Sequence, residues 1–253
     1  MLRIIDARTG RPVDAAPARR GLTRVEAHAS GSDISALRVL LVADVLLRAL
    51  ELGGTPVWCL LTGGRRQAEL RAAATALGIR PFEEGRDLAA GLGEAQIVHV
   101  VGDDGAMPEG GVVVGVAPAI RADPAREAPG VAGAASADPP ADPAVLRLAL
   151  LATRRDTPVR IDPDALDRAG RMLARRRRAV AHWARQPSRP IPDEVRGRLR
   201  AAWEDNLDVT EVLKVLDQVA EAADLPDGAR FETYAHADRL LGLDLVRDLG
   251  SPA

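Results

Sequence analysis

Hydrophobic and polar positions follow two different patterns along this chain, and the change between them divides it. Up to residue 116, apolar runs of strand length alternate with segments of helical period. These patterns predict helices at 34–52 and 66–77. They predict strands at 22–27, 55–61, 95–101 and 111–116. Strands that alternate with helices across short Gly-rich turns are typical of a doubly wound parallel sheet. We therefore predict a Rossmann-like α/β domain over residues 1–116.

The longest predicted helix, 34–52, has its charged residues on one arc. Asp44, Arg48 and Glu51 share this arc, and Arg38 lies just off its edge. The other faces are apolar, as expected for a helix that packs on a sheet.

The character of the sequence changes after residue 116. Between Ala117 and Pro143 there are six prolines and many alanines, but no leucine or aromatic residue. This composition predicts a linker or mobile loop over residues 117–141 rather than a packed element.

From residue 142 onward the pattern is helical throughout. Helices are predicted to begin at Asp142, Asp162, Pro192 and Asp208, and a last one covers 230–241. Asp208 and Glu211 have the spacing of a capping box. These helices predict a helical bundle over residues 142–253.

Composition excludes several classes of function. A net charge of -2 gives no overall attraction to nucleic acid, and 2% aromatic residues provide no platform for stacking bases. The longest apolar stretch, from Val39 to Leu47, is interrupted by Asp44 and is too short to cross a bilayer. The start of the chain shows no secretory signal, and the single Cys59 allows no intrachain disulfide. We expect a cytoplasmic protein with no membrane partner.

Two C-terminal segments carry a family resemblance. The run Val145-Leu146-Arg147-Leu148-Ala149-Leu150-Leu151 and the capping segment Asp205-Asn206-Leu207-Asp208-Val209-Thr210-Glu211 resemble the region that follows the catalytic fold of cysteinyl-tRNA synthetases and of mycothiol-pathway cysteine ligases. In the family the capping segment has Thr-Pro where this chain has Val209-Thr210. Residues 2–6 and 38–54 match the opening strand and the first helix of the family more weakly. The resemblance covers 1–61 and 142–245, and implies a truncated sheet domain of the class I synthetase type.

The resemblance also shows which parts of the family's chemistry are absent. Asp33-Ile34-Ser35-Ala36 stands where the family has His-Ile-Gly-His, and Asp33 adds negative charge where phosphates would lie. The Lys-Met-Ser-Lys-Ser motif cannot exist, because Lys214 is the only lysine. The nearest substitute is the arginine-bearing segment 119–126. The family's zinc needs two cysteines, so we expect no zinc site and interpret Cys59 as a core residue.

The candidate site is a nucleotide or small-molecule cleft. The resemblance places it near Ser32, Asp33, Ser35 and Arg38, and implies ATP as its nucleotide.

For other residues two interpretations stay open. His28 and His99 are either catalytic or hydrogen-bonded core histidines. The turn from Gly102 to Gly105 is either a ligand loop or a plain turn. The run from Arg175 to Arg178 is interpreted as a solvated helix whose aliphatic stems cover neighbouring residues, rather than as a site for RNA or an acidic partner. We assign no catalytic residue.

Three hypotheses of function follow. The first is a cysteinyl-tRNA synthetase-like protein that has lost cysteine adenylation and has a binding, regulatory or accessory role. The alternative is an ATP-dependent aminoacyl or cysteine ligase with a rebuilt, zinc-independent site. The third is a subunit that completes its cleft or core in a homo- or hetero-oligomer. A tRNA partner is not expected, because the chain ends where an anticodon-binding domain would follow.

Overall fold

The fold is α/β, built on a five-stranded parallel sheet. The computed structural model describes residues 1–18, 21–63, 67–84, 94–103, 105–122 and 142–250. The strand order is β5-β4-β3-β6-β7, and all neighbouring strands are parallel. The strands are β3 (Leu22–His28), β4 (Val57–Thr62), β5 (Glu83–Glu84), β6 (Glu94–Gly102) and β7 (Val112–Val116). The predicted parallel sheet is confirmed.

Alternation along β3 shows how the sheet is covered. Thr23, Val25 and Ala27 are fully buried on the face toward α1 (Ile34–Leu52). The residues between them, which include Glu26 and His28, lie on the opposite face and are half-buried. α2 (Gln67–Ala76) packs beside α1 and adds its apolar side to the same core.

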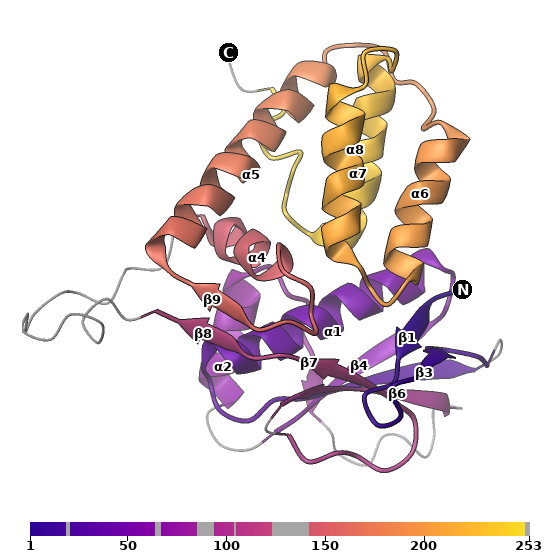
Figure 1. Cartoon of the computed structure of the whole chain (residues 1–253), viewed down its shortest axis with the longest axis vertical. Helices are drawn as coiled ribbons and strands as arrows, with labels where there is room; N and C mark the ends of the chain where they lie inside the picture. Colours follow the sequence, from indigo (N-terminus) through magenta and orange to yellow (C-terminus); the bar gives the residue numbers. More distant parts are fainter. Residues whose placement is uncertain (19–20, 64–66, 85–93, 104, 123–141, 251–253) are drawn as a thin grey trace, which may run out of the picture.

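The helix α1 begins and ends as predicted, but only part of its charged arc faces solvent. Asp44 and Arg38 are 0% and 1% exposed, because C-terminal helices cover the side of α1 that faces away from the sheet (Figure 1). The helix is therefore buried on nearly all sides, and its charged residues need partners inside the protein.

Five helices follow residue 142 within the described residues 142–250. They are α4 (Pro143–Leu151), α5 (Pro163–Trp183), α6 (Asp193–Glu204), α7 (Val209–Glu221) and α8 (Asp227–Leu241). Asp142, Asp162 and Asp208 cap α4, α5 and α7 through their side chains, as their positions predict. α5, α6, α7 and α8 stand above α1, with α8 in contact with α5, α6 and α7 (Figure 1).

Two pairs of short strands lie outside the main sheet. β1 (Arg3–Ile5) pairs antiparallel with β2 (Pro12–Asp14), and β8 (Ala119–Arg121) pairs parallel with β9 (Val159–Ile161). β8 falls in the predicted linker, and Ala117 and Ala119 are buried. The expectation of a linker is therefore wrong for residues 117–122, because small side chains pack closely there. Residues 123–141 lie outside the described part of the chain.

The arginine run on α5 is only in part the solvated surface that was predicted, since Arg175 and Arg178 alone are exposed. Arg176 and Arg177 are 2% and 5% exposed. Arg176 donates to Asp217 of α7 at 3.0 Å, and Arg177 donates to Asp142 and to the carbonyl oxygens of Leu243 and Asp244. These two residues tie α5 to its neighbours, so the run is in part a structural device.

No helix in the described ranges is long and apolar enough to cross a membrane.

Candidate functional site

A shallow hollow opens at the carboxyl ends of the central strands. It measures about 400 Å³, which includes the open solvent within it. It lies between the ends of β3 and β6 and the start of α1. Its lining residues are His28, Ala29, Ser30, Asp33, Ser35, Ala36, Val39, Gly102, Asp103, Gly105, Val116 and Pro118. We call this hollow the cleft.

The cleft lies at the topological switch point of the sheet. From β3 the chain moves outward through β4 to β5, and then returns to the other side of β3 as β6 and β7. The connections from β3 and β6 therefore leave in opposite directions and open a crevice between them. In open α/β sheets, ligands bind in this crevice at the carboxyl edge.

Three of the four predicted site residues lie at the start of α1. Asp33 is the N-cap, and its Oδ1 accepts a hydrogen bond from Ala36 N at 2.8 Å. Ser35 lines the cleft but is bound to β8, since its Oγ donates to the carbonyl oxygen of Ala119 at 2.9 Å and accepts from Ala119 N at 3.0 Å. Ser32 Oγ donates to Glu69 of α2 at 3.2 Å, and Ser32 does not line the cleft.

Arg38, the fourth predicted residue, is turned away from the cleft. Its guanidinium donates to backbone carbonyl oxygens of Ala117, Pro118, Thr153, Arg154 and Thr157 at 2.8 to 3.4 Å. Burial lowers its pKa to about 10, so the side chain is still a cation at pH 7. Arg38 therefore fastens two loops to α1, and its charge is not offered to a ligand in the cleft.

The charge of the cleft is acidic. Its ionisable lining residues in the described ranges are Asp33, Asp103 and His28. Asp103 is exposed at the end of β6, whereas Asp104 lies outside the described residues. Burial lowers the pKa of His28 below 6.5, and Glu26 opposes this shift only in part, so His28 is neutral at pH 7. The described lining therefore presents negative charge and hydroxyl groups.

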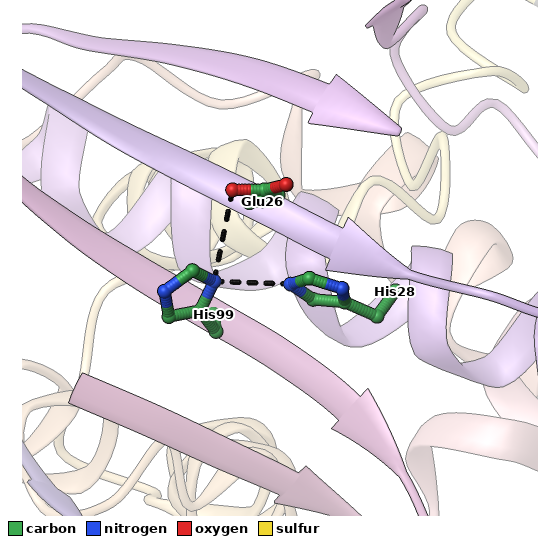
Figure 2. A group of neighbouring side chains, drawn as sticks. All are labelled: Glu26, His28 and His99. Carbon is green, nitrogen blue, oxygen red and sulfur yellow. Dashed lines mark hydrogen bonds and ion pairs between the residues drawn. The ribbon is translucent and has the colours of Figure 1, made fainter. Parts of the chain in front are cut away.

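His28 also belongs to a second group of side chains, Glu26, His28 and His99, which we call the Glu–His–His cluster. Glu26 and His28 are two residues apart on β3 and share a face, and Glu26 is paired in register with His99 of β6. His28 Nε2 and His99 Nδ1 are 3.0 Å apart, and His99 Nδ1 is 3.7 Å from Glu26 Oε2. Figure 2 shows that the two imidazoles and the carboxylate point toward one another across the two strands.

Neighbouring groups fix the cluster in place. Thr62 of β4 donates to Glu26 Oε1 at 2.5 Å, and Arg24 lies 3.7 Å from Oε2. Burial, together with the neighbouring His28, lowers the pKa of His99 below 6.5. Both imidazoles are therefore neutral at pH 7, and one nitrogen of each can offer a lone pair.

The sequence pointed to the two histidines but not to Glu26. Both open interpretations of His28 and His99 are compatible with the hydrogen bond between their rings. The signal for Glu26 was present as alternation, because Arg24, Glu26 and His28 are polar at every second position of a predicted strand. The pairing with His99 depends on the strand register, which the sequence does not give.

Cys59 does not belong to either group. Its thiol lies toward the core and donates to the carbonyl oxygen of Pro81 at 3.4 Å. Burial raises its pKa to about 11, so the thiolate that a metal or an electrophile requires is absent at pH 7.

The sequence matches no known family profile and no curated protein.

Proposed function

We propose that this protein binds a small molecule in the cleft, and that its ligand carries a cationic group such as an amine rather than a triphosphate. The observation that carries this proposal is the charge of the lining. Asp33 and Asp103 are acidic, His28 is neutral, and the expected cation Arg38 is held by backbone carbonyls. Carboxylates attract an ammonium group and repel phosphates in a partly dry crevice.

The start of α1 supports the same assignment. A free helix N-terminus offers N–H groups to an anion. Here Asp33 Oδ1 already accepts from Ala36 N, and Ser35 Oγ is bound to both backbone groups of Ala119. The Asp33 carboxylate thus occupies the position at which a phosphate would bind.

The proposal extends the resemblance to cysteinyl-tRNA synthetases and cysteine ligases. We infer a protein that keeps a class I synthetase type of sheet and a helical bundle, but no longer adenylates cysteine, and that has a binding, regulatory or accessory role. Support comes from the acidic cleft and from the side-chain caps at Asp142 and Asp208, which lie in the two segments that carry the resemblance. A protein of such ancestry would retain binding of the amino group of an amino acid.

An arginine-based ligase is the second candidate, and one observation favours it. Arg121 of β8 lines a larger hollow beside the cleft, together with Ser32, Asp33 and Ser35. An arginine there can bind a phosphate. The two candidates differ in the ligand they require, because the ligase must bind ATP.

A thermal-shift panel separates these candidates. Free amino acids, polyamines and ATP would each be titrated against the protein, since a ligand that binds the folded state raises the unfolding temperature with concentration. We expect stabilisation by at least one amine and none by ATP. Stabilisation by ATP alone would contradict the proposal.

Two variants locate the binding. Asp103→Asn removes one negative charge from an exposed position in the cleft, and we expect the stabilising amine to bind at least about threefold more weakly. Asp167→Asn makes the same change on the exposed surface of α5 and should leave binding unchanged. Equal effects of the two variants would place the ligand elsewhere.

A further inference from the structure

We infer that the Glu–His–His cluster is a binding site for a divalent transition-metal ion, with Zn²⁺ as the ion its ligand set fits. This inference goes beyond the proposed function and rests on other observations, although His28 belongs to both the cleft and the cluster. It departs from the expectation of no zinc, which rested on the missing cysteines, because this ligand set contains no thiolate.

The ligand types are the first argument. Two imidazoles and one carboxylate form the protein ligand set of one class of zinc sites, in which a fourth position stays open to water or substrate. Magnesium and calcium prefer oxygen ligands, so the two nitrogens select against them. The cluster offers Nε2 of His28, Nδ1 of His99 and a carboxylate oxygen of Glu26.

The distances are the second argument. Atoms bound to one tetrahedral Zn²⁺ at about 2.0–2.1 Å lie roughly 3.3 Å from each other. The two distances here, 3.0 Å between the imidazole nitrogens and 3.7 Å between His99 Nδ1 and Glu26 Oε2, lie on either side of this value. All three ligand atoms lie within 4.8 Å of one another. Small side-chain rotations are therefore enough to surround an ion.

The orientation of His99 is the third argument. His99 is buried, and its Nε2 has no hydrogen-bond partner within the described ranges. A buried polar atom without a partner costs about 1–3 kcal/mol. The ring nevertheless directs Nδ1 toward Glu26 and His28, and Gly111 lies close against its Cδ2 side, where a Cβ atom would come within 3.2 Å. His99 thus presents Nδ1, rather than Nε2, to the other two side chains of the cluster.

The neighbours of Glu26 also fit a metal. Thr62 donates to one oxygen of Glu26 and leaves the other directed toward His99. Arg24 is the competing cation, 3.7 Å from Glu26 Oε2, and the ion would take over this contact.

The test is a calorimetric titration of the full chain with Zn²⁺ after removal of metal by a chelator. We expect one Zn²⁺ per chain, and no competition from Mg²⁺ in excess. His28→Gln and Glu26→Gln should each weaken binding by at least about tenfold, because each removes a ligand. The glutamine in place of Glu26 keeps the shape of the side chain and an acceptor for Thr62.

His182→Gln is the matched control, since His182 is 68% exposed on α5, away from the cluster. It should bind Zn²⁺ as the unmodified protein does. Circular dichroism of each variant, recorded without metal, checks that it is folded, and Glu26→Gln still decides the matter if His28→Gln unfolds.

Three results would overturn the inference. They are no binding by the unmodified protein, equal binding by a folded Glu26→Gln variant, and equal losses in Glu26→Gln and His182→Gln. No organic ligand enters this titration, and Asp103→Asn should leave it unchanged. Failure of the zinc site and failure of the amine site are therefore seen separately.

Discussion

At the scale of single residues, the most consequential side chain outside the site is Asp44. Its carboxylate is 0% exposed in the middle of α1 and accepts from Arg147 of α4 at 2.6 Å and from Arg48 at 2.9 Å. Arg147 is also fully buried and donates to the carbonyl oxygen of Leu241 at the end of α8, at 2.7 Å. This buried ion pair joins α1 to two C-terminal helices.

Replacing Asp44 should be costly, because it leaves Arg147 as an uncompensated buried charge. We expect Asp44→Asn to lower the free energy of unfolding by about 3–5 kcal/mol, as measured by urea denaturation. The double variant Asp44→Asn, Arg147→Met is the control and should recover part of the loss. A loss below about 1 kcal/mol in the single variant would contradict this account.

The same pair makes stability depend on pH. Burial alone would raise the pKa of Asp44, but Arg147 and Arg48 lower it below 3.8 overall. A carboxyl group with a lowered pKa adds stability above its unfolded value, and loses it as the pH falls through the folded value. The difference in stability between the unmodified protein and Asp44→Asn should therefore be constant near neutral pH and shrink below pH 3.8.

Arg38 gives a second prediction at this scale. Lysine keeps the charge but cannot reproduce the planar fork of donors that reaches five carbonyl oxygens. We expect Arg38→Lys to lower the free energy of unfolding by about 1–3 kcal/mol and to leave ligand and Zn²⁺ affinities unchanged. If Arg38→Lys kept full stability but bound the amine more weakly, Arg38 would contribute to ligand binding in the cleft, and this prediction would be wrong.

These residues mark a limit of the sequence. The caps Asp33, Asp142 and Asp208 were predictable, because an N-cap bonds to a backbone group two or three residues away. Helical periodicity placed Asp44 on a polar arc and Arg38 just off its edge. It could not predict their partners, because Arg147 and the carbonyl groups near residues 117 and 154 are distant in the chain. Local periodicity carries no information about such partners.

At the scale of elements, the α7 cap keeps only half of the predicted capping box. Asp208 Oδ1 accepts from Glu211 N at 2.9 Å. In the reverse direction, Asp208 N donates to the carbonyl oxygens of Ala202 and Asp205, and the Glu211 carboxylate accepts from Lys214 at 3.0 Å. Asp208 thus stabilises the start of α7, whereas Glu211 contributes a surface ion pair.

The two residues should therefore differ when each is replaced by alanine. We expect Asp208→Ala to lower the free energy of unfolding by about 0.5–2 kcal/mol. Glu211→Ala should cost only about 0–1 kcal/mol, because it removes an exposed ion pair. Urea denaturation of both variants measures the difference, and equal losses would mean that the reciprocal bond exists in solution.

Long elements were more predictable than short ones. α1 was predicted with the bounds it has, since nineteen residues give a clear apolar pattern. The three-residue strands β8 and β9 were missed, because each is too short to show a period and their paired residues are 40 positions apart in the sequence. The pairing of β8 with β9 also explains why the start of the Pro-rich segment is packed.

At the scale of the whole molecule, α1 is the central element. The sheet covers one side of it and the C-terminal helices cover the other (Figure 1). The start of α1 borders the cleft, and its middle carries the buried Asp44. Bound ligand should therefore stabilise the two parts of the chain together in a single unfolding transition.

The edge strand β7 has partners within the chain. Ala7 N donates to the carbonyl oxygen of Val113 at 2.8 Å, and Arg155 donates to that of Gly115 at 2.6 Å. These bonds occupy part of this edge from within the chain. The hypothesis of a subunit that completes its core in an oligomer rested on the missing middle of the family's catalytic fold, which would leave sheet edges to cover.

We propose that this scaffold binds a ligand in an acidic cleft and does not activate amino acids. Amino-acid-dependent exchange of pyrophosphate into ATP, measured with the purified full chain and Mg²⁺, is the decisive experiment. We predict no exchange above the rate without amino acid, for cysteine and for every other amino acid. Exchange that depends on any one amino acid would contradict the claim and favour the arginine-based ligase.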